Sequence, residues 1–399
     1  MLKNKFIIIF VFFLFANWQV VNQNRVSQFE TTDDLVNINI FSQIKVLSFT
    51  FSSEIGSYSI WANGKEILNS TAAPFIKFTY INDSIEVKTV DNIVGKFKRI
   101  KISSLDDVKS FRVKLISPDR KPRLYQDNLI IESELGVLKC INEVELDNYV
   151  AGVVQAESGK KSYPEFYKVQ AILARTFALS HLQKHVVEGF SLCDHTHCQV
   201  YFGKSIEFNI MKAVADTKYT VVVDDNLNLI DAAFHSNSGG QTVNSEDLWG
   251  SKLSYLRSVN DTFSIKMPNA IWERKMSKED WLSYLKIKHN YPIDDEKALS
   301  EALSFKQDTR KIFLEANQIK VPLKNVRADL QLKSTFFSIV SVGDTIIFKG
   351  RGFGHGVGMC QEGAMRMAKL GYKYSDIINF YYQKTQLIDL QSLNYFRDE

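Results

Sequence analysis

Cysteine and histidine gather in one short run of the sequence, Cys193-Asp-His-Thr-His-Cys198. Zinc prefers thiolate and imidazole ligands, and a structural zinc site arranges four of them as a tetrahedron. Cys193, His197 and Cys198 fit a tight ligand loop, and the fourth ligand could be His185 on the preceding helix or His195. The alternative is a Cys193–Cys198 disulfide with solvated histidines, which an oxidising compartment would permit.

A single carboxylate, Glu157, closes an apolar helical stretch and precedes a Ser-Gly turn. A carboxyl group held against apolar side chains has a raised pKa and can act as a general acid near neutral pH. Taken alone, a glutamate at this place is most often a solvated helix end. The residue therefore needs a second line of evidence before it is assigned chemistry.

The segment Arg351–Met359 reads RGFGHGVGM, with a glycine at every second position. Glycine lets the backbone approach a ligand closely or adopt positive φ. The segment is not a phosphate loop, because no Lys-Ser or Lys-Thr follows it. His355 within it could bind sugar or assist proton transfer, or it could be a buried, hydrogen-bonded histidine.

A second glycine turn, Phe234–Thr242, reads FHSNSGGQT, and its small polar residues suit hydrogen bonds to sugar hydroxyls. A serine hydrolase is the alternative, but Ser236 and Ser238 lack the Gly-x-Ser-x-Gly elbow of that class. Trp249 follows and could stack on a sugar ring or lie in the core.

Helices and strands must position these residues, and the spacing of apolar residues along the chain indicates where each lies. Residues 36–131 alternate apolar and polar side chains in short runs split by Gly, Asn, Asp and Ser, which predicts strands. Helical periods follow at residues 146–157, with an N-cap at Asp147, and at 164–185; strands return at 221–234. Residues 277–303 predict a charged helical insertion, and helices close the chain at 361–370 and 375–382. The fold class is therefore α+β: an N-terminal β-rich domain, residues 21–128, followed by a mixed α+β catalytic domain, residues 129–399, with a helical insertion.

The N-terminus predicts export. Lys3 and Lys5 precede the uncharged run FIIIFVFFLFA, which has the length of a signal peptide core, so we expect residues 1–20 to be a signal peptide. An uncleaved N-terminal anchor is the alternative, and no other stretch has transmembrane length. The net charge is +4, and roughly +2 without the signal, which argues against a nucleic-acid partner. We expect a protein of the periplasm or cell envelope, or a secreted one.

Six segments occur in an order that resembles the stage II sporulation protein D family, which includes the amidase enhancers. They are YVAGVVQAES, VQAILARTFAL, LCDHTHCQVYFG, FHSNSGGQT with LWGSKLSYLRSV, LKSTFF, and GRGFGHGVGMCQEGAMRMAKLGY with INFYYQKT. The resemblance covers residues 129–387. It implies a lytic transglycosylase, which cleaves the MurNAc–GlcNAc bond of peptidoglycan strands stripped of stem peptides and leaves anhydro-MurNAc ends.

The resemblance also assigns roles to residues. The family's catalytic glutamate lies in a Val-Val-x-x-Glu segment, which is Glu157 here. Some members bind zinc through a Cys-Asp-x-x-His-Cys loop, matched by Cys193, His197 and Cys198, with His185 as our choice of fourth ligand. Four protein ligands leave no position open for water, so the zinc is expected to be structural. The predicted substrate-binding residues are Arg175, Ser236, Ser238, Gly239, Gly240, Gly354, His355, Gly356 and Gln361.

One departure from the family pattern stands after the glycine-rich segment, where Glu362 occupies a position that is usually Trp. Its carboxylate could face solvent or join the groove. The alternative function is a non-catalytic glycan-binding amidase enhancer that activates a partner peptidoglycan amidase. Peptidoglycan strands are the expected ligand of both.

Overall fold

The computed structural model describes residues 35–71 and 73–395 of the 399-residue chain. The predicted signal peptide lies outside these residues. None of the helices in the described part has the length and apolar character needed to cross a membrane. Helices and strands are both abundant, which confirms the α+β class.

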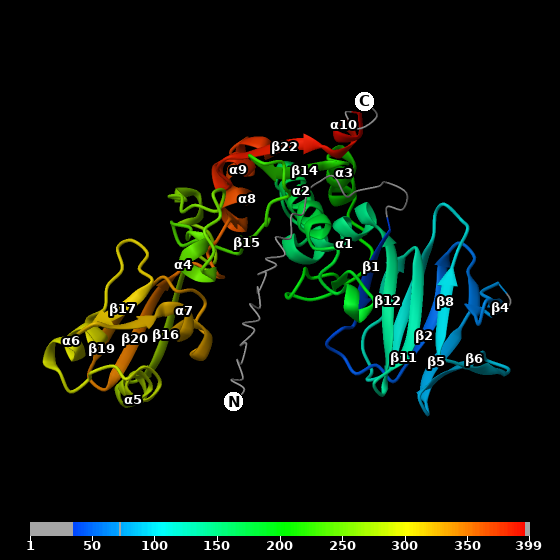
Figure 1. Ribbon diagram of the computed structural model, residues 1–399, viewed down its shortest axis with the longest axis horizontal. Helices are drawn as coiled ribbons and strands as arrows, with labels where there is room; N and C mark the ends of the chain where they lie inside the picture. Colours follow the sequence, from blue (N-terminus) through cyan, green and yellow to red (C-terminus); the bar gives the residue numbers. More distant parts are fainter. Residues whose placement is uncertain (1–34, 72, 396–399) are drawn as a thin grey trace, which may run out of the picture.

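The N-terminal part is a sandwich of two sheets (Figure 1). One sheet has the order β13-β1-β12-β11-β8-β3-β4 and the other β10-β9-β2-β5-β6-β7. The strands are β1 (Leu35–Ile40), β2 (Ser48–Ile55), β3 (Ser59–Ala62), β4 (Lys65–Asn69), β5 (Ile76–Ile81), β6 (Ser84–Lys88), β7 (Ile93–Phe97), β8 (Arg99–Ser103), β9 (Ser110–Ser117), β10 (Arg123–Gln126), β11 (Asn128–Glu134), β12 (Val137–Glu145) and β13 (Leu192–Cys193).

The alternation seen in the sequence sets the two faces of these strands. In β2, Phe49 and Phe51 are fully buried and Thr50 between them is only partly so; in β9, Phe111 and Val113 alternate with Arg112 in the same way. Side chains of successive strand residues point to opposite faces, so the apolar set of each sheet meets the other sheet.

Strands β11 and β12 belong to the sandwich. β11 pairs with β8 on one side and with β12 on the other, and β12 pairs in turn with β1. The boundary expected at residue 128 therefore falls at the start of a strand in the middle of a sheet. β1 also pairs in parallel with β13, so the first strand joins the sandwich to the segment that carries Cys193.

The central part is helical. α1 (Leu146–Ser158) leaves β12 directly, and α2 (Pro164–Ser180) packs against α1, α3 (Phe208–Asp216), α8 (Gln361–Lys369) and α9 (Tyr374–Tyr381). The N-cap of α1 is Glu145, so the N-cap expected at Asp147 is wrong. Asp147 lies in the first turn of the helix instead and pairs with Arg175.

Short elements complete this central part. β14 (Thr220–Asp224) pairs with β22 (Thr385–Asp389), and β15 (Phe234–His235) pairs in parallel with β21 (Met359–Cys360). A one-turn helix α4 (Ser245–Trp249), the 3-10 turns Val186–Glu188 and Thr262–Ser264, and the terminal α10 (Leu390–Tyr395) fill the connections. Two distant parts of the chain, near residues 235 and 360, thus lie side by side.

The insertion between them has its own hydrophobic core, built around Trp281, Phe337 and Phe348. It holds a three-stranded sheet of β16 (Ile271–Ser277), β20 (Thr345–Arg351) and β19 (Phe337–Val342), and the hairpin β17 (Phe313–Ala316) with β18 (Ile319–Pro322). Its helices are α5 (Lys278–His289), α6 (Glu296–Ser304) and α7 (Leu323–Asp329). The expected charged helices at 277–303 are α5 and α6, and strands accompany them.

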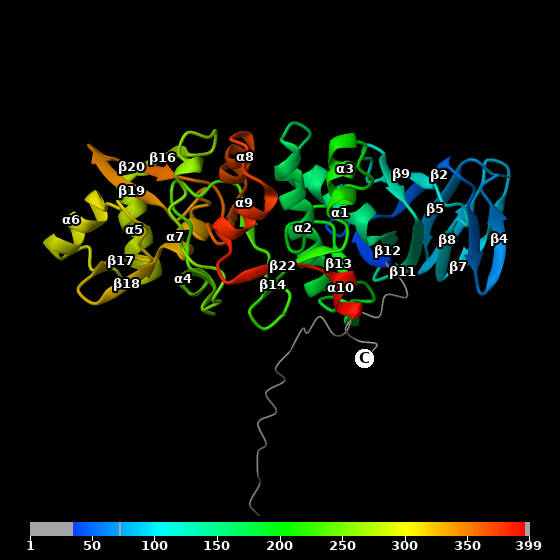
Figure 2. The same ribbon diagram turned by 90° about the horizontal axis from the view of Figure 1, so that it is seen from above.

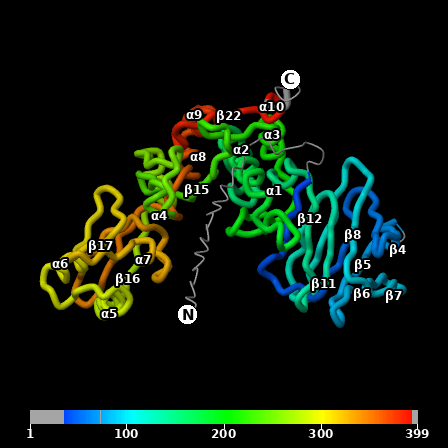
Figure 3. Tube along the Cα trace, viewed as in Figure 1, coloured from blue at the N-terminus to red at the C-terminus, as the bar shows by residue number. Residues whose placement is uncertain are grey.

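The three parts follow one another along the long axis of the molecule, with the helical part in the middle (Figures 1 and 2). The trace passes from the sandwich through the centre into the insertion and then returns to the centre with α8, α9 and β22 (Figure 3). This return brings the start of α8, with Gln361, against Glu157 at the end of α1.

Candidate functional site

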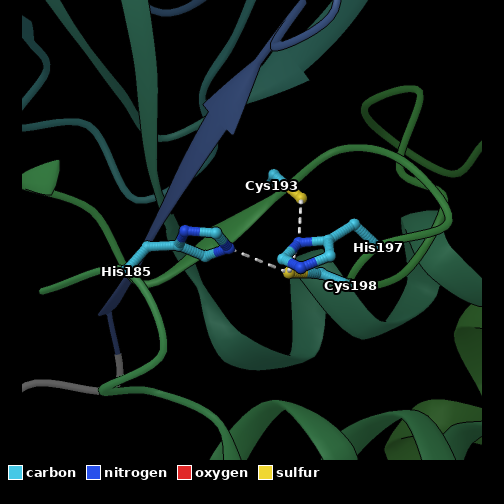
Figure 4. Close-up of side chains that lie close together, drawn as sticks. All are labelled: His185, Cys193, His197 and Cys198. Atoms are coloured by element: carbon cyan, nitrogen blue, oxygen red, sulfur yellow. Dashed lines mark hydrogen bonds between the residues drawn. The ribbon is translucent and has the colours of Figure 1, made fainter.

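The four predicted zinc ligands lie together. His185, Cys193, His197 and Cys198 offer ligand atoms that all lie within 4.8 Å of one another (Figure 4). The Cys198 sulfur is 3.5 Å from His185 Nε2 and 3.9 Å from His197 Nδ1, and the Cys193 sulfur is 3.7 Å from His197 Nδ1. His195 is turned away, and its Nδ1 contacts Gln43.

These distances fit a tetrahedral metal site. Zinc bonds of about 2.3 Å to sulfur and about 2.0–2.1 Å to nitrogen place the two ligand atoms about 3.6 Å apart on a tetrahedral edge. Cys193 and Cys198 are both unpaired cysteines, so the disulfide alternative does not describe this structure. The donor set and its spacing therefore match zinc.

Neighbouring groups affect the orientation and the pKa of these ligands. Glu188 Oε1 lies 2.5 Å from His185 Nδ1 and so orients the ring with Nε2 toward Cys198. A hydrogen bond shared with Cys193 lowers the pKa of Cys198 to about 6, and the same bond raises the pKa of Cys193 to about 12. A metal binds both sulfurs as thiolates, so its binding would release the proton that the two thiols share.

The loop is also tied to the sandwich. The buried carboxylate of Asp194 accepts hydrogen bonds from the backbone N–H of Phe41 at 2.7 Å and from both the N–H and the hydroxyl of Ser42. Arg123 approaches the same carboxylate at 3.3 Å. The ligand loop is therefore held from the end of β1 as well as from its own ligands.

Glu157 lies in the last turn of α1, directly beside this loop. Its Oε1 accepts a hydrogen bond from the backbone N–H of Val200, 3.0 Å away and two residues after the ligand Cys198. Its backbone carbonyl accepts a weaker bond, 3.4 Å, from the Gln361 side chain at the start of α8. Three segments far apart in sequence thus meet at this residue.

Burial raises the pKa of Glu157, and the hydrogen bond from Val200 lowers it by less. The net shift is upward, because desolvation disfavours the charged form. Within the described residues no second carboxylate contributes to this shift. The site thus offers one carboxyl group that keeps its proton to higher pH than an ordinary glutamate.

The glycine-rich segment packs against the chain itself. His355 Nε2 donates to the Phe234 carbonyl at 2.8 Å, and His355 Nδ1 accepts from the Val357 N–H at 3.1 Å. Burial lowers the pKa of His355 to about 4, so the ring is neutral at physiological pH. With both nitrogens engaged, His355 holds the turn, and Trp249 lies against its ring with centroids 5.5 Å apart.

Close packing also accounts for the two flanking glycines. Both have positive φ, and a Cβ atom on Gly354 would lie 2.8 Å from Cβ of His235, while one on Gly356 would lie 2.9 Å from the Val243 side chain. Because neither glycine has a Cβ atom, the glycine-rich segment can pack closely against the Phe234–Thr242 turn and Val243.

Two predicted substrate-binding residues are instead part of the scaffold. Arg175 is 1% exposed and pairs with Asp147 at 2.8 Å while donating to backbone carbonyls that include Thr217. Ser238 is fully buried, and its hydroxyl bonds Asp261 and Ser264 at 2.7 Å. Neither side chain is free to reach a ligand.

Of the other predicted residues of that turn, Ser236 and Gly240 lie closer to the surface and Gly239 is buried. Ser236 is partly exposed, and its hydroxyl has a 3.4 Å contact with Asn269. Gly239 packs on the backbone of Arg351 and Gly352, whereas Gly240 is partly exposed beside Ile265.

Glu362, the residue at the unusual position, does not face solvent. It is 8% exposed and accepts hydrogen bonds from the side chain of Asn237 at 2.6 Å and from both the N–H and the side chain of Asn269. The carboxylate cross-links the Phe234–Thr242 turn to α8. The sequence pattern did not reveal Asn269, because it lies in none of the six segments. It did not reveal the role of the Val200 amide either, because a backbone N–H contact cannot be predicted from the residue type.

The chain is similar in sequence to several known proteins. The family model described as "Stage II sporulation protein" matches residues 134–223, which include Glu157 and all four candidate zinc ligands. The stage II sporulation protein D of Bacillus subtilis (strain 168) is 32% identical over 263 residues, 62% of this chain and 75% of that protein. That of Bacillus amyloliquefaciens is 30% identical over 63% of this chain and 76% of its own length. The amidase enhancer of Bacillus subtilis (strain 168) is 29% identical over 59% of this chain and 40% of its own length. The chain belongs to the stage II sporulation protein D family.

Proposed function

We propose that the protein is a peptidoglycan lytic transglycosylase in which Glu157 is both acid and base. The observation that carries the proposal is the Glu157 carboxyl group, half-buried at the end of α1, held by one backbone amide and raised in pKa. A hydrolysing glycosidase commonly needs two carboxylates, and Glu157 has no carboxylate partner that perturbs it in the described part of the chain.

One carboxyl group suffices if the nucleophile belongs to the substrate. The Glu157 proton passes to the glycosidic oxygen as its bond to C1 of MurNAc breaks, and the GlcNAc hydroxyl leaves. The Glu157 carboxylate then takes the proton of the MurNAc 6-hydroxyl as that oxygen bonds to C1, which gives the anhydro end and restores the acid. Water is not consumed, because the neighbouring hydroxyl is already in place.

The raised pKa of Glu157 supports the first step, since the acid must hold its proton near neutral pH. The Val200 N–H bonds the Oε1 atom and leaves the other carboxyl oxygen for the substrate. Five members of the predicted substrate-binding set keep partly exposed positions: Ser236, Gly240, Gly354, His355 and Gln361. Both ring nitrogens of His355 are engaged, so Ser236, Gly240, Gly354 and Gln361 remain our candidates for contacts with the glycan.

Zinc, held by His185, Cys193, His197 and Cys198, would have a structural role. Four protein ligands close the coordination shell, so the metal would supply rigidity to the loop that ends at the Val200 amide. Protein side chains, and not the metal, would then contact the substrate.

The alternative is a non-catalytic glycan-binding protein that activates a partner peptidoglycan amidase. The 29% identity to a protein named amidase enhancer favours it. Both functions place the protein outside the cytoplasm, in the periplasm, in the cell envelope or secreted, with peptidoglycan strands as ligand.

The two functions differ in what the purified protein does alone. Incubated with glycan strands stripped of stem peptides, a lytic transglycosylase releases fragments with anhydro-MurNAc ends, which mass spectrometry identifies by a mass one water lower than that of hydrolysis products. Release of such fragments supports the enzyme. Binding to the strands without release, together with stimulation of an added amidase, contradicts it and supports the alternative.

A further inference from the structure

A small pocket lies between the central part and the insertion, apart from Glu157 and the zinc ligands. Its volume is about 120 Å³. One wall comes from the segment after the Phe234–Thr242 turn and the other from the chain around β17 and α7. The lining residues are Gln241, Thr242, Val243, Asn244, Asp247, Leu248, Ser258, Arg310, Lys311, Ile312, Lys324 and Thr335.

The pocket is positively charged. Three cationic side chains line it, Arg310, Lys311 and Lys324, against the single carboxylate of Asp247. Asp247 is engaged with its neighbour Asn244, whose side-chain N–H donates to it at 3.0 Å. None of these three cations forms an ion pair with a carboxylate in the part of the chain that the structure describes.

Arg310 is the least compensated of the three. Its guanidinium donates only to neutral acceptors: the carbonyls of Gln241 and Ser238, both at 2.6 Å, and the Thr335 hydroxyl at 3.2 Å. Burial and the nearby charge of Arg351 lower its pKa to about 9. A cation taken out of water without a counter-charge is costly, and a bound anion would offset that cost.

The two lysines are available to a ligand at the rim. Both residues are exposed. Lys324 donates to the Leu248 carbonyl at 3.1 Å, and the Lys311 ammonium lies 5.0 Å from the centre of the Phe305 ring. An ammonium group has three donors, so these contacts leave donors for an anion.

Size limits the ligand. The volume of about 120 Å³ has room for a few water molecules. A carboxylate or a phosphate group fits this space, and the rest of a longer polymer would extend from the open side of the pocket. We propose that this pocket binds a small oxyanion, the carboxylate or phosphate group of a cell-wall polymer. The polymer's identity rests on the proposed function, whereas the charge of the ligand rests on the pocket alone.

Matched pairs of charged and neutral ligands test the proposal on the full chain by isothermal titration calorimetry. N-acetylmuramic acid is compared with N-acetylglucosamine, which lacks the carboxylate, and glycerol phosphate with glycerol. We expect the charged member of at least one pair to bind and its neutral partner to bind more weakly. Preference for the first pair identifies a carboxylate site, and preference for the second a phosphate site.

Variants locate the binding. Lys311→Gln and Lys324→Gln should each weaken binding of the charged ligand about two- to five-fold, and together by about the product of the two. Lys349→Gln removes an exposed lysine of the same insertion that does not line the pocket, and should leave the affinity unchanged. Equal affinity in the wild type and all four variants, or no binding of either charged ligand, overturns the proposal. Release of anhydro fragments is measured separately, so its loss bears on the proposed function and not on the pocket.

Discussion

Gly152 lies in the middle of α1, and replacing it with alanine tests how tightly that helix is packed on the segment after the zinc loop. A Cβ atom at this position would lie 2.5 and 2.8 Å from two ring atoms of Tyr201 and closer still to the carbonyl oxygen of Gly203. Ordinary contact between such atoms is about 3.5 Å, so one side must move by about 1 Å.

The magnitude follows from two opposing effects. Alanine favours a helix by about 1 kcal/mol over glycine, while overpacking a filled interface costs about 1–3 kcal/mol. Because the contact includes backbone, we expect Gly152→Ala to lower the free energy of unfolding by about 1–2 kcal/mol net. The same displacement moves the Val200 amide away from Glu157, and an error of about 1 Å at a catalytic group can cost roughly 100-fold in rate.

The assay is urea unfolding followed by circular dichroism, with release of anhydro fragments measured on the folded variant. Ala156→Gly is the matched control, since it changes helix propensity in the same helix at a partly exposed position. It should lose about 1 kcal/mol and keep Glu157 in place. If Gly152→Ala were more stable than the wild type and fully active, the packing of α1 on Tyr201 and Gly203 would be refuted.

Three further changes probe the metal, the acid and the buried network. Cys198→Ser should reduce the metal content from about one zinc per chain to near zero, measured by elemental analysis; unchanged zinc would exclude Cys198 as a ligand. Because the raised pKa of Glu157 makes its carboxylate unfavourable in the folded state, wild-type stability falls as pH rises through that pKa. Glu157→Gln should therefore gain in melting temperature over the wild type at pH 8 and match it at pH 4, and the opposite order would contradict the raised pKa. Glu362→Ala should cost about 1–3 kcal/mol, because it leaves one buried N–H of the Asn237 side chain without an acceptor and removes an acceptor from the partly buried Asn269; a loss below about 0.5 kcal/mol would show that the network is not needed.

The local pattern of apolar and polar residues predicted the fold class and most helices and strands. This spacing depends only on which side chains of a helix or strand are buried. The helices α5 and α6 of the insertion follow directly from it. The place of β11 and β12 did not follow, since a strand's partner in a sheet is set by long-range pairing with β8 and β1. A boundary near residue 128 was therefore expected where the sheet in fact continues.

The Cys/His cluster that could hold a metal was predictable because its residue types are rare and close in sequence. The choice between His185 and His195 needed the structure, which turns His195 toward Gln43. The buried roles of Arg175 and Ser238 were not predictable, because a polar residue in a motif can serve either a ligand or the scaffold. Their partners, Asp147 and Asp261, carry no motif of their own.

Glu157 carries the central claim, and one substitution tests it. Glu157→Gln keeps the shape of the side chain and an oxygen that can accept from Val200, but it removes the transferable proton. The purified variant should retain zinc and bind peptide-free glycan strands. We predict that it releases anhydro-MurNAc fragments at least about 100-fold more slowly than the wild type, the lower range for loss of general acid–base catalysis. Release at the wild-type rate would contradict the account.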